Sequence, residues 1–368
     1  MPDLPILAVD HLEFYVGNAR QAAAYYAQAF GFRTVAYRGP ETGHRDAASY
    51  VVAQGAIRLV FTSALRRDHP VTEHVARHGD GVRVVALEVP DARRAYALAL
   101  GRGATGVAEP ATLRDEHGVA TTASIAAYGD TVHALVERGD YAGPFLPGFA
   151  AAEVARPGGP HAGGRPIGLT GIDHVVANVA EGEMDRWVDF YRDVLGFDLL
   201  VSFDDADVST EYSALMSKVV ATGGGRVKLP INEPADGRRR SQIEEYLEAY
   251  GGPGVQHVAL ATDDIVAAVD ELRARGVAFL TVPDGYYDDL AARVGAIDED
   301  LAELRRLNIL ADRDDEGYLL QIFTQPVQDR PMVFFEVIQR RGATSFGKGN
   351  FRALFEAIER EQARRGGL

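Results

Sequence analysis

The chain has 368 residues, more than one hydrophobic core usually serves, so we expect two domains. It contains no cysteine, which excludes disulfide scaffolds, iron–sulfur clusters and thiolate metal sites, so any metal must be held by His, Asp or Glu. A net charge of −15 without a long basic cluster argues against nucleic-acid binding. We find no apolar run of about 18 residues that could span a bilayer and no secretory signal, so we expect a cytoplasmic protein without membrane contact.

The first half of the chain opens with a strand–helix–strand pattern. Residues 11–16 are strand-like, and a helical segment with apolar side chains at helical spacing follows over residues 20–30. The same plan returns near residue 170, where Asp173-His174 opens a strand and residues 184–195 are helical. A glycine follows each helix, where a left-handed residue is favoured. The sequence therefore indicates an internal repeat.

The repeat continues through the second part of each half. Residues 81–87 parallel residues 254–260, and each stretch precedes a helix that begins at an aspartate, over 91–100 and 264–275. After these helices we expect strands that end at a proline. The two prolines are Pro110 and Pro283. A weaker third parallel aligns residues 133–138 with residues 335–340.

These patterns predict an α+β fold of two similar modules. We expect an N-terminal domain over residues 1–150, a linker over 151–168 that is rich in Gly and Pro, and a C-terminal catalytic domain over 169–368. Each module should form a mixed sheet that curls around a cavity, with the helices outside.

The repeat allows equivalent strand positions to be compared within one chain. Three such positions of the C-terminal half hold His174, His257 and Glu336. Their counterparts in the N-terminal half are His11, Val84 and Ala134. Two imidazoles and one carboxylate form the facial ligand set of non-haem iron(II) oxygenases, which leaves adjacent coordination positions open. We therefore expect one metal site per chain, in the second half, with the first half as a structural and dimer-forming partner.

Each candidate ligand also has a structural interpretation. A single strand histidine is more often a satisfied core residue, and Glu336 could form a buried ion pair with an arginine. The coincidence at three repeat-equivalent positions favours the metal. The other histidines are interpreted as incidental: His44, His69, His74, His78, His117, His133 and His161.

Several stretches of the second half match the motifs of a known family. They are Gly171–His174, Glu211–Val220, Leu229–Pro234, Gln256-His257, Leu320–Thr324, Phe334–Ile338 and Phe346–Phe351. The chain resembles the 4-hydroxyphenylpyruvate dioxygenases over nearly its whole length. The resemblance implies two tandem vicinal-oxygen-chelate domains, built from paired βαβββ modules that form curled, open-barrel sheets.

The resemblance also implies a reaction and a cofactor. The substrates would be 4-hydroxyphenylpyruvate and O₂, and the products homogentisate and CO₂, in tyrosine and phenylalanine catabolism. The substrate's keto acid would chelate one Fe²⁺ per chain. Decarboxylation to a ferryl species, ring hydroxylation and side-chain migration would follow. The family further implies a homodimer or a homotetramer.

The same motifs imply which side chains line the cavity. Neutral polar groups beside the iron would be Ser217, Asn232, Gln242, Gln256 and Gln321. Substrate-binding residues would be Pro230, Phe323, Phe346, Asn350 and Phe351. The three phenylalanines would sandwich the substrate ring, where aromatic contact contributes about 0.5–1.5 kcal/mol beyond burial. A surface or core position is the alternative for each.

The last segment predicts an amphipathic helix with Leu354, Phe355 and Ile358 on one face. We expect Asn350 to cap this helix. Glycines at 347 and 349 suit a gate that closes the cavity against water. A helix docked permanently on the core is the alternative.

Three other functions remain open at this point. 4-Hydroxymandelate synthase would share the fold, triad and substrate, although the Asn232 motif favours the dioxygenase. An extradiol catechol dioxygenase would need a further acid–base histidine. A metal-free binding module would bind no stoichiometric iron.

Overall fold

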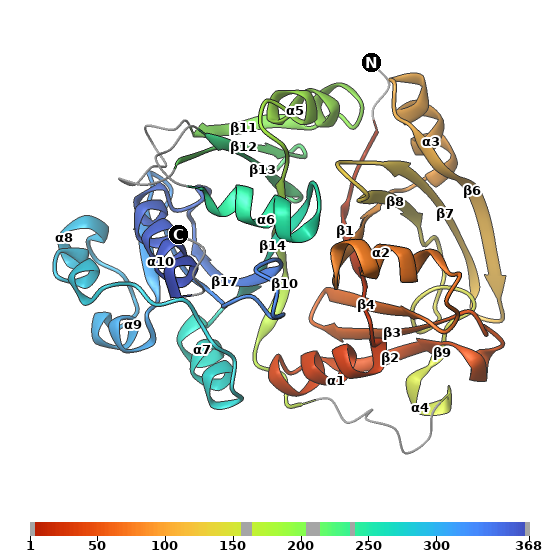
Figure 1. Ribbon diagram of the computed structural model, residues 1–368, viewed down its shortest axis with the longest axis horizontal. Helices are drawn as coiled ribbons and strands as arrows, with labels where there is room; N and C mark the ends of the chain where they lie inside the picture. Colours follow the sequence, from red (N-terminus) through yellow and green to blue (C-terminus); the bar gives the residue numbers. More distant parts are fainter. Residues whose placement is uncertain (1–3, 156–163, 204–213, 236–239, 365–368) are drawn as a thin grey trace.

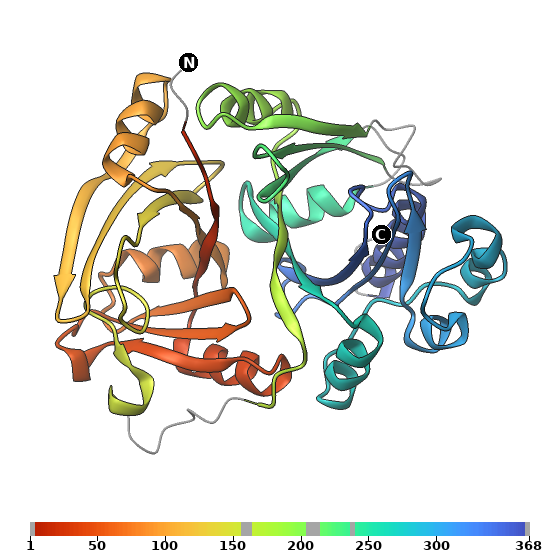
Figure 2. The same cartoon turned by 180° about the vertical axis from the view of Figure 1, so that it is seen from behind.

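The computed structural model describes residues 4–155, 164–203, 214–235 and 240–364. Each half of the chain forms its own sheet, and the two sheets lie side by side (Figure 1). The N-terminal sheet has nine strands in the order β6-β7-β8-β5-β1-β4-β3-β2-β9, and the C-terminal sheet has eight in the order β11-β12-β13-β10-β14-β17-β16-β15. Seen from behind, β10 still lies between the two halves (Figure 2). The predicted α+β class with curled sheets is confirmed.

The strands of the two sheets have the following bounds. In the N-terminal sheet they are β1 Ala8–Tyr15, β2 Arg33–Arg38, β3 Ala47–Gln54, β4 Ile57–Ala64, β5 Gly81–Glu88, β6 Gly106–Asp115, β7 Gly118–Ala126, β8 Val132–Glu137 and β9 Ala150–Ala151. In the C-terminal sheet they are β10 Leu169–Asn178, β11 Asp198–Phe203, β12 Ala214–Ala221, β13 Lys228–Ala235, β14 Gly254–Thr262, β15 Leu310–Arg313, β16 Tyr318–Phe323 and β17 Phe334–Arg341.

The pairing of the strands reproduces the internal repeat. In the first half β1 runs antiparallel to β5 and parallel to β4, and β5 runs parallel to β8. In the second half β10 runs antiparallel to β14 and parallel to β13, and β14 runs parallel to β17. His11 lies opposite Ala86 as His174 lies opposite Ala259, and Ala134 takes the place of Glu336 in the next strand. The alignment predicted from the sequence is therefore the structural one.

Several helices begin where the sequence provides a capping side chain. The helices are α1 Ala19–Ala29, α2 Pro70–His78, α3 Ala92–Gly101, α4 Ala152–Ala155, α5 Met184–Asp193, α6 Gln242–Tyr250, α7 Ile265–Ala274, α8 Leu290–Val294, α9 Leu301–Leu307 and α10 Lys348–Arg364, with 3₁₀ turns η1 Pro40–Thr42 and η2 Asp284–Tyr287. Asn18, Asp91 and Asp264 accept hydrogen bonds from the first turns of α1, α3 and α7. These side chains satisfy amides that a helix leaves without partners.

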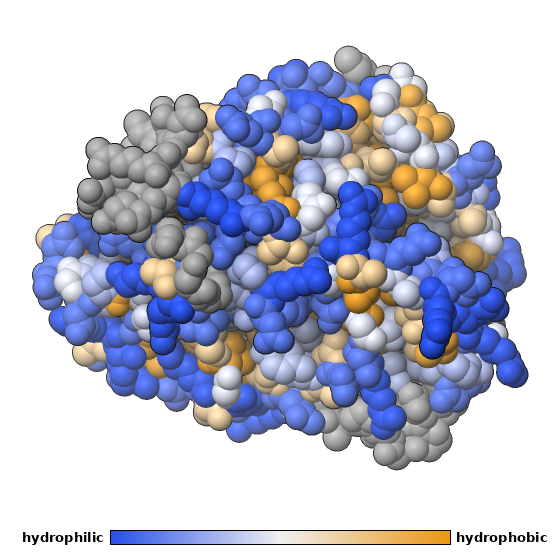
Figure 3. Space-filling view, in the orientation of Figure 1, coloured by the Kyte–Doolittle hydropathy of each residue, from blue (hydrophilic) through white to orange (hydrophobic). Residues whose placement is uncertain are grey.

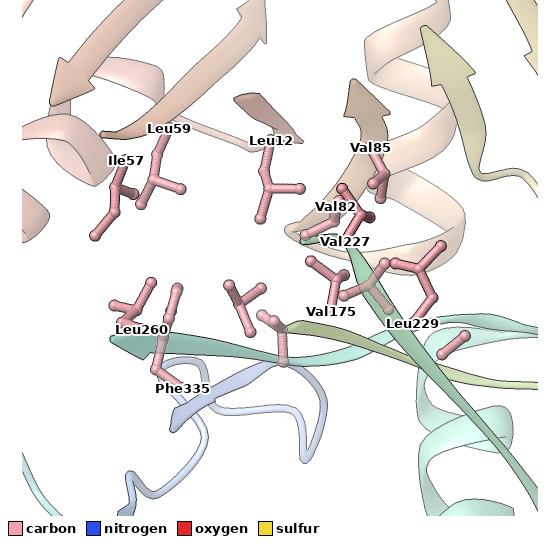
Figure 4. Close-up of a cluster of buried hydrophobic side chains, with 14 of the residues drawn as sticks. Leu12, Ile57, Leu59, Val82, Val85, Val175, Val227, Leu229, Leu260 and Phe335 are labelled. Carbon is pink, nitrogen blue, oxygen red and sulfur yellow. The ribbon is translucent and has the colours of Figure 1, made fainter. Parts of the chain in front are cut away.

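Strand alternation sends the two faces of each sheet to different environments. Leu12 of β1 and Val175 of β10 point into a core that the two halves share, where Leu59 faces Leu260 and Phe335 (Figure 4). The neighbouring residues His11 and His174 point to the opposite, concave faces. One face of each sheet is therefore buried in the shared core, and the opposite, concave face remains available to line a cavity.

Two predicted strands differ in the structure. Residues 277–283 form no strand, because Phe279 makes only an isolated bridge with Thr324 before the chain enters η2, α8 and α9. The prediction of a strand ending at Pro283 is thus wrong. Pro110 lies inside the edge strand β6 instead of at its end, at a register shift between Ala108 and Ala111. An edge strand tolerates proline because the missing N–H faces solvent.

The region between the halves contains more structure than a plain linker. β9 pairs with β2 of the N-terminal sheet and α4 follows directly, while residues 156–163 lie outside the described part. The predicted boundaries 1–150, 151–168 and 169–368 stay predictions. Within the described residues, no helix is long and apolar enough to cross a membrane. The face drawn in Figure 3 is mainly hydrophilic, with scattered apolar patches.

Candidate metal centre

Three neighbouring strands bring the predicted ligands together. His174 lies on β10, His257 on β14 and Glu336 on β17, and candidate ligand atoms of all three lie within 4.8 Å of one another. The Glu336 Oε2 atom is 3.1 Å from His174 Nε2 and 3.5 Å from His257 Nε2. The three side chains are almost completely buried.

Each histidine is oriented through its other nitrogen. His174 Nδ1 donates to Asp173 Oδ1 at 2.8 Å, and His257 Nδ1 donates to Gln256 Oε1 at 2.9 Å. With Nδ1 protonated, each ring in its neutral form would present the Nε2 lone pair to the centre of the cluster. Such outer hydrogen bonds are the usual support of metal-binding histidines. The two Nε2 lone pairs and the Glu336 carboxylate therefore fit one divalent cation.

The electrostatics of the cluster favour an ionised carboxylate. Burial raises the pKa of Glu336, but the charge of His174 and hydrogen bonds from both histidines outweigh it, so the net shift is downward. Burial lowers the pKa of His257, and Glu336 does not reverse that shift. Burial lowers the pKa of His174, but Glu336 and Asp173 together raise it by more. The pKa of His174 therefore lies above its usual value. A buried carboxylate that stays charged needs a cationic partner.

Arg340 of β17 joins the centre to the segment that precedes α10. Its guanidinium donates twice to Asp173, at 2.8 and 2.9 Å, and once to the carbonyl of Ser345, at 2.5 Å. It also lies 5.4 Å above the ring of Phe346, which meets His174 edge-on at 5.2 Å. We call Asp173, His174, Arg340 and Phe346 the C-terminal clamp.

The N-terminal half contains the same arrangement without the metal ligands. His11 Nδ1 donates to Asp10 at 2.5 Å, and Arg138 donates twice to the same carboxylate, at 2.5 and 2.7 Å. Arg138 also donates to the carbonyl of Phe145 and lies 5.1 Å above its ring, which meets His11 edge-on at 5.0 Å. We call Asp10, His11, Arg138 and Phe145 the N-terminal clamp. Its presence beside Val84 and Ala134 shows that the clamp forms independently of a metal.

A cavity of about 80 Å³ opens beside the triad. The structure brings most of the predicted site residues to its wall. They are His174, Ser217, Pro230, Asn232, Gln242, Gln256, His257, Gln321, Phe323, Glu336 and Phe346. Sequence reasoning did not assign to the site Val176, Phe203, Val219 and Phe334, which also line it, and named Leu354, Phe355 and Ile358 only as a helix face. Strand alternation could have identified Val176, which lies two residues after a ligand.

Two predicted substrate residues stand apart from this wall. Asn350 does not line the cavity, and it does not cap α10, because that helix already begins at Lys348. Its side-chain oxygen instead accepts a hydrogen bond from Tyr286 at 2.6 Å. The prediction of a cap missed this tertiary partner, which lies in an insertion that the repeat does not contain. Phe351 belongs to α10, but its side chain lies outside the described part of the structure.

The histidines interpreted as incidental are not metal ligands among the described residues, but two of them connect the halves. His133 is fully buried, donates from Nδ1 to Val85 and accepts from the Tyr191 hydroxyl at 2.7 Å. His78 bonds the carbonyl of Tyr250 at 2.6 Å. His161 lies outside the described residues.

Known proteins are similar to this chain over nearly its whole length. The profile of the Glyoxalase/Bleomycin resistance protein/Dioxygenase superfamily matches residues 8–135 and 171–322. The 4-hydroxyphenylpyruvate dioxygenase of Dictyostelium discoideum is 50% identical over 365 residues, which cover 98% of this chain and 99% of that protein. The one of Yarrowia lipolytica is 48% identical over 368 residues, covering 98% and 93%. The chain belongs to the 4-hydroxyphenylpyruvate dioxygenase family.

A solved structure extends the comparison to three dimensions. A triple mutant of 4-hydroxymandelate synthase from Streptomyces coelicolor matches with a TM-score of 0.86 and 35% identity, over 98% of this chain and 100% of that one. Both the predicted family and the predicted tandem vicinal-oxygen-chelate fold are thus confirmed. A 4-hydroxyphenylpyruvate dioxygenase is an oxidoreductase, and the buried triad of this chain could hold a metal ion.

Proposed function

We propose that this chain converts 4-hydroxyphenylpyruvate and O₂ to homogentisate and CO₂, with one Fe²⁺ bound by His174, His257 and Glu336. The observation that carries the proposal is the convergence of these side chains in the wall of an otherwise neutral cavity. The iron, when bound, would supply the oxidative chemistry, and the protein would supply binding and position. The reaction would be a step of tyrosine and phenylalanine catabolism.

The charge of the site suits a keto acid. A divalent cation with one carboxylate ligand keeps one net positive charge, which the substrate carboxylate can neutralise. The neutral side chains of Ser217, Asn232 and Gln242 add hydrogen-bonding groups without adding charge. Gln321 offers a buried amide nitrogen that has no hydrogen-bond partner among the described residues. We therefore assign this amide to a substrate oxygen.

The aromatic wall would hold the substrate ring. Phe334 stacks on the ring of His257 at 4.8 Å, and Phe323 meets the same imidazole edge-on at 6.0 Å. Phe346 lines the cavity beside His174. A flat aromatic substrate fits between such walls, and the roles predicted for Phe323, Phe346 and Phe351 remain part of the proposal.

Helix α10 would act as the gate of the cavity. Leu354, Phe355 and Ile358 of α10 form part of its wall, and the volume of the cavity is only about 80 Å³. Pockets for organic ligands usually measure roughly 300–1,000 Å³. Substrate binding therefore requires α10 to move outward, and its return would exclude water from the reaction.

The nearest alternative is 4-hydroxymandelate synthase, because a solved structure that matches this chain is a mutant of that enzyme. Product analysis after incubation with Fe²⁺, O₂ and 4-hydroxyphenylpyruvate separates the two. We expect homogentisate as the main product. Hydroxymandelate as the sole product would reject the proposed dioxygenase activity. The cytoplasmic location and the homodimeric or homotetrameric assembly stay predictions, which cell fractionation and light scattering can test.

A further inference from the structure

The concave face of the N-terminal sheet lines a second, partly open cavity of about 490 Å³. Its volume lies within the range of roughly 300–1,000 Å³ that is usual for organic ligands. The buried imidazole of His11 lines this cavity, as His174 lines the first one. The second cavity belongs to the other sheet and shares no lining residue with the first cavity.

Strand register shows that the two cavities are built from equivalent positions. Ser49 pairs with Thr62 in the N-terminal sheet as Ser217 pairs with Asn232 in the C-terminal sheet. All four of these residues line their own cavity. The polar groups that would contact substrate in one half thus have polar counterparts in the other.

Two equivalent positions differ in chemical character. Arg38 pairs with Ser49 as Phe203 pairs with Ser217, so an arginine takes the place of a phenylalanine. Glu13 follows His11 by two residues as Val176 follows His174, so a carboxylate takes the place of a valine. The N-terminal cavity therefore has a cation and an anion where the metal-binding one is apolar.

The surroundings of these two charges leave them available to a ligand. Glu13 Oε1 accepts a hydrogen bond from Thr62 at 2.6 Å, which leaves its other oxygen without such a bond among the described contacts. Arg38 has no acidic partner within salt-bridge distance in the described structure, and its guanidinium lies 5.7 Å from the ring of Phe149. Phe145 and Phe149 add an aromatic wall to the same cavity. A ligand with a carboxylate, an ammonium group and a ring would complement Arg38, Glu13 and this aromatic wall.

We propose that the N-terminal cavity binds an aromatic α-amino acid. Its carboxylate pairs with Arg38, its ammonium group pairs with Glu13, and its ring contacts Phe145 and Phe149. No metal takes part, because Val84 and Ala134 replace two of the three ligands. This binding is independent of the reaction proposed for the other half.

The test is calorimetric titration of the iron-loaded protein under anaerobic conditions, with 4-hydroxyphenylpyruvate saturating the metal site. L-phenylalanine is the probe; 3-phenylpropanoate, which lacks the ammonium group, and phenethylamine, which lacks the carboxylate, are the comparisons. We expect one additional site per chain for L-phenylalanine, with at least tenfold weaker binding of both analogues. Absence of that site, or equal binding of either analogue, would overturn the proposal.

Variants locate the binding within the molecule. Glu13→Gln and Arg38→Met should each weaken L-phenylalanine binding at least tenfold. Arg33→Met removes an exposed charge from the same strand β2 outside the cavity, so it should leave the affinity unchanged. Circular dichroism melting verifies that each variant folds. Folded Glu13→Gln and Arg38→Met proteins that retain full affinity would refute the assignment.

Discussion

At the scale of single residues, the duplicated chain separates structural from functional side chains. His11 and His174 occupy the same position and have the same aspartate and aromatic neighbours, yet only His174 has His257 and Glu336 beside it. The sequence identified the triad because a repeat supplies its own comparison. It could not identify His133 as a link between the halves, because its partner Tyr191 is distant in sequence.

His133 predicts a pH dependence of stability. Burial lowers its pKa to about 4, whereas an unfolded histidine titrates near 6.5. The unfolded chain therefore takes up a proton that the folded protein refuses, so stability falls as the pH drops from about 6.5 to about 4, by on the order of 3 kcal/mol. Melting temperatures of wild type and His133→Gln across this range measure the effect. The variant should show a shallower loss; an identical profile would contradict this account.

At the scale of elements, the two clamps offer a matched pair of variants. Arg340→Met and Arg138→Met each remove a guanidinium from a buried carboxylate, so both should lower stability, by roughly 3 kcal/mol. Only Arg340 supports a metal ligand through Asp173, so only Arg340→Met should weaken Co²⁺ binding, by about 10–100-fold. Spectroscopic Co²⁺ titration distinguishes the two. Equal loss of Co²⁺ affinity in both variants would show that the clamp has no specific role at the metal.

Gly347 lies between Phe346 of the C-terminal clamp and the first residue of α10, Lys348. Its φ of +76° is left-handed, and a Cβ there would lie 2.8 Å from the Gln321 amide, inside the cavity wall. Gly276 has a similar φ of +88° with open space around it. Gly347→Ala and Gly276→Ala should therefore cost about 1 kcal/mol each through backbone strain, but only Gly347→Ala should also raise the KM for 4-hydroxyphenylpyruvate. Steady-state kinetics and thermal melting test this, and equal KM values in both variants would argue against this effect of Gly347 on the cavity.

The elements also show where sequence reasoning reached its limit. Helices with an aspartate cap and an apolar stripe, such as α3 and α7, begin within a residue of the prediction because their signals are local. The strand predicted after α7 was wrong because an insertion of short helices replaces the strand expected from the repeat. The predicted helix cap at Asn350 was wrong because the partner of this side chain, Tyr286, belongs to that insertion. Tertiary contacts of this kind leave no periodic trace.

At the scale of the whole molecule, one apolar core fixes the two sheets against each other. Residues such as Leu12, Val85, Val175 and Leu260 belong to a single cluster that spans both halves. The candidate metal ligands point away from this core, so one face of their strands packs in the core and the other face lines the cavity. The sequence predicted the two modules but not the size of the core that they share, since alternation alone does not reveal which face meets which partner.

The central claim is that His174, His257 and Glu336 bind one iron ion and leave neighbouring positions for the substrate. Anaerobic titration with Fe²⁺ in the presence of 4-hydroxyphenylpyruvate tests it most directly. We expect one Fe²⁺ per chain and a weak visible charge-transfer band from keto-acid chelation, with both absent in His257→Ala. Stoichiometric iron and an unchanged band in folded His257→Ala protein would contradict the proposed centre.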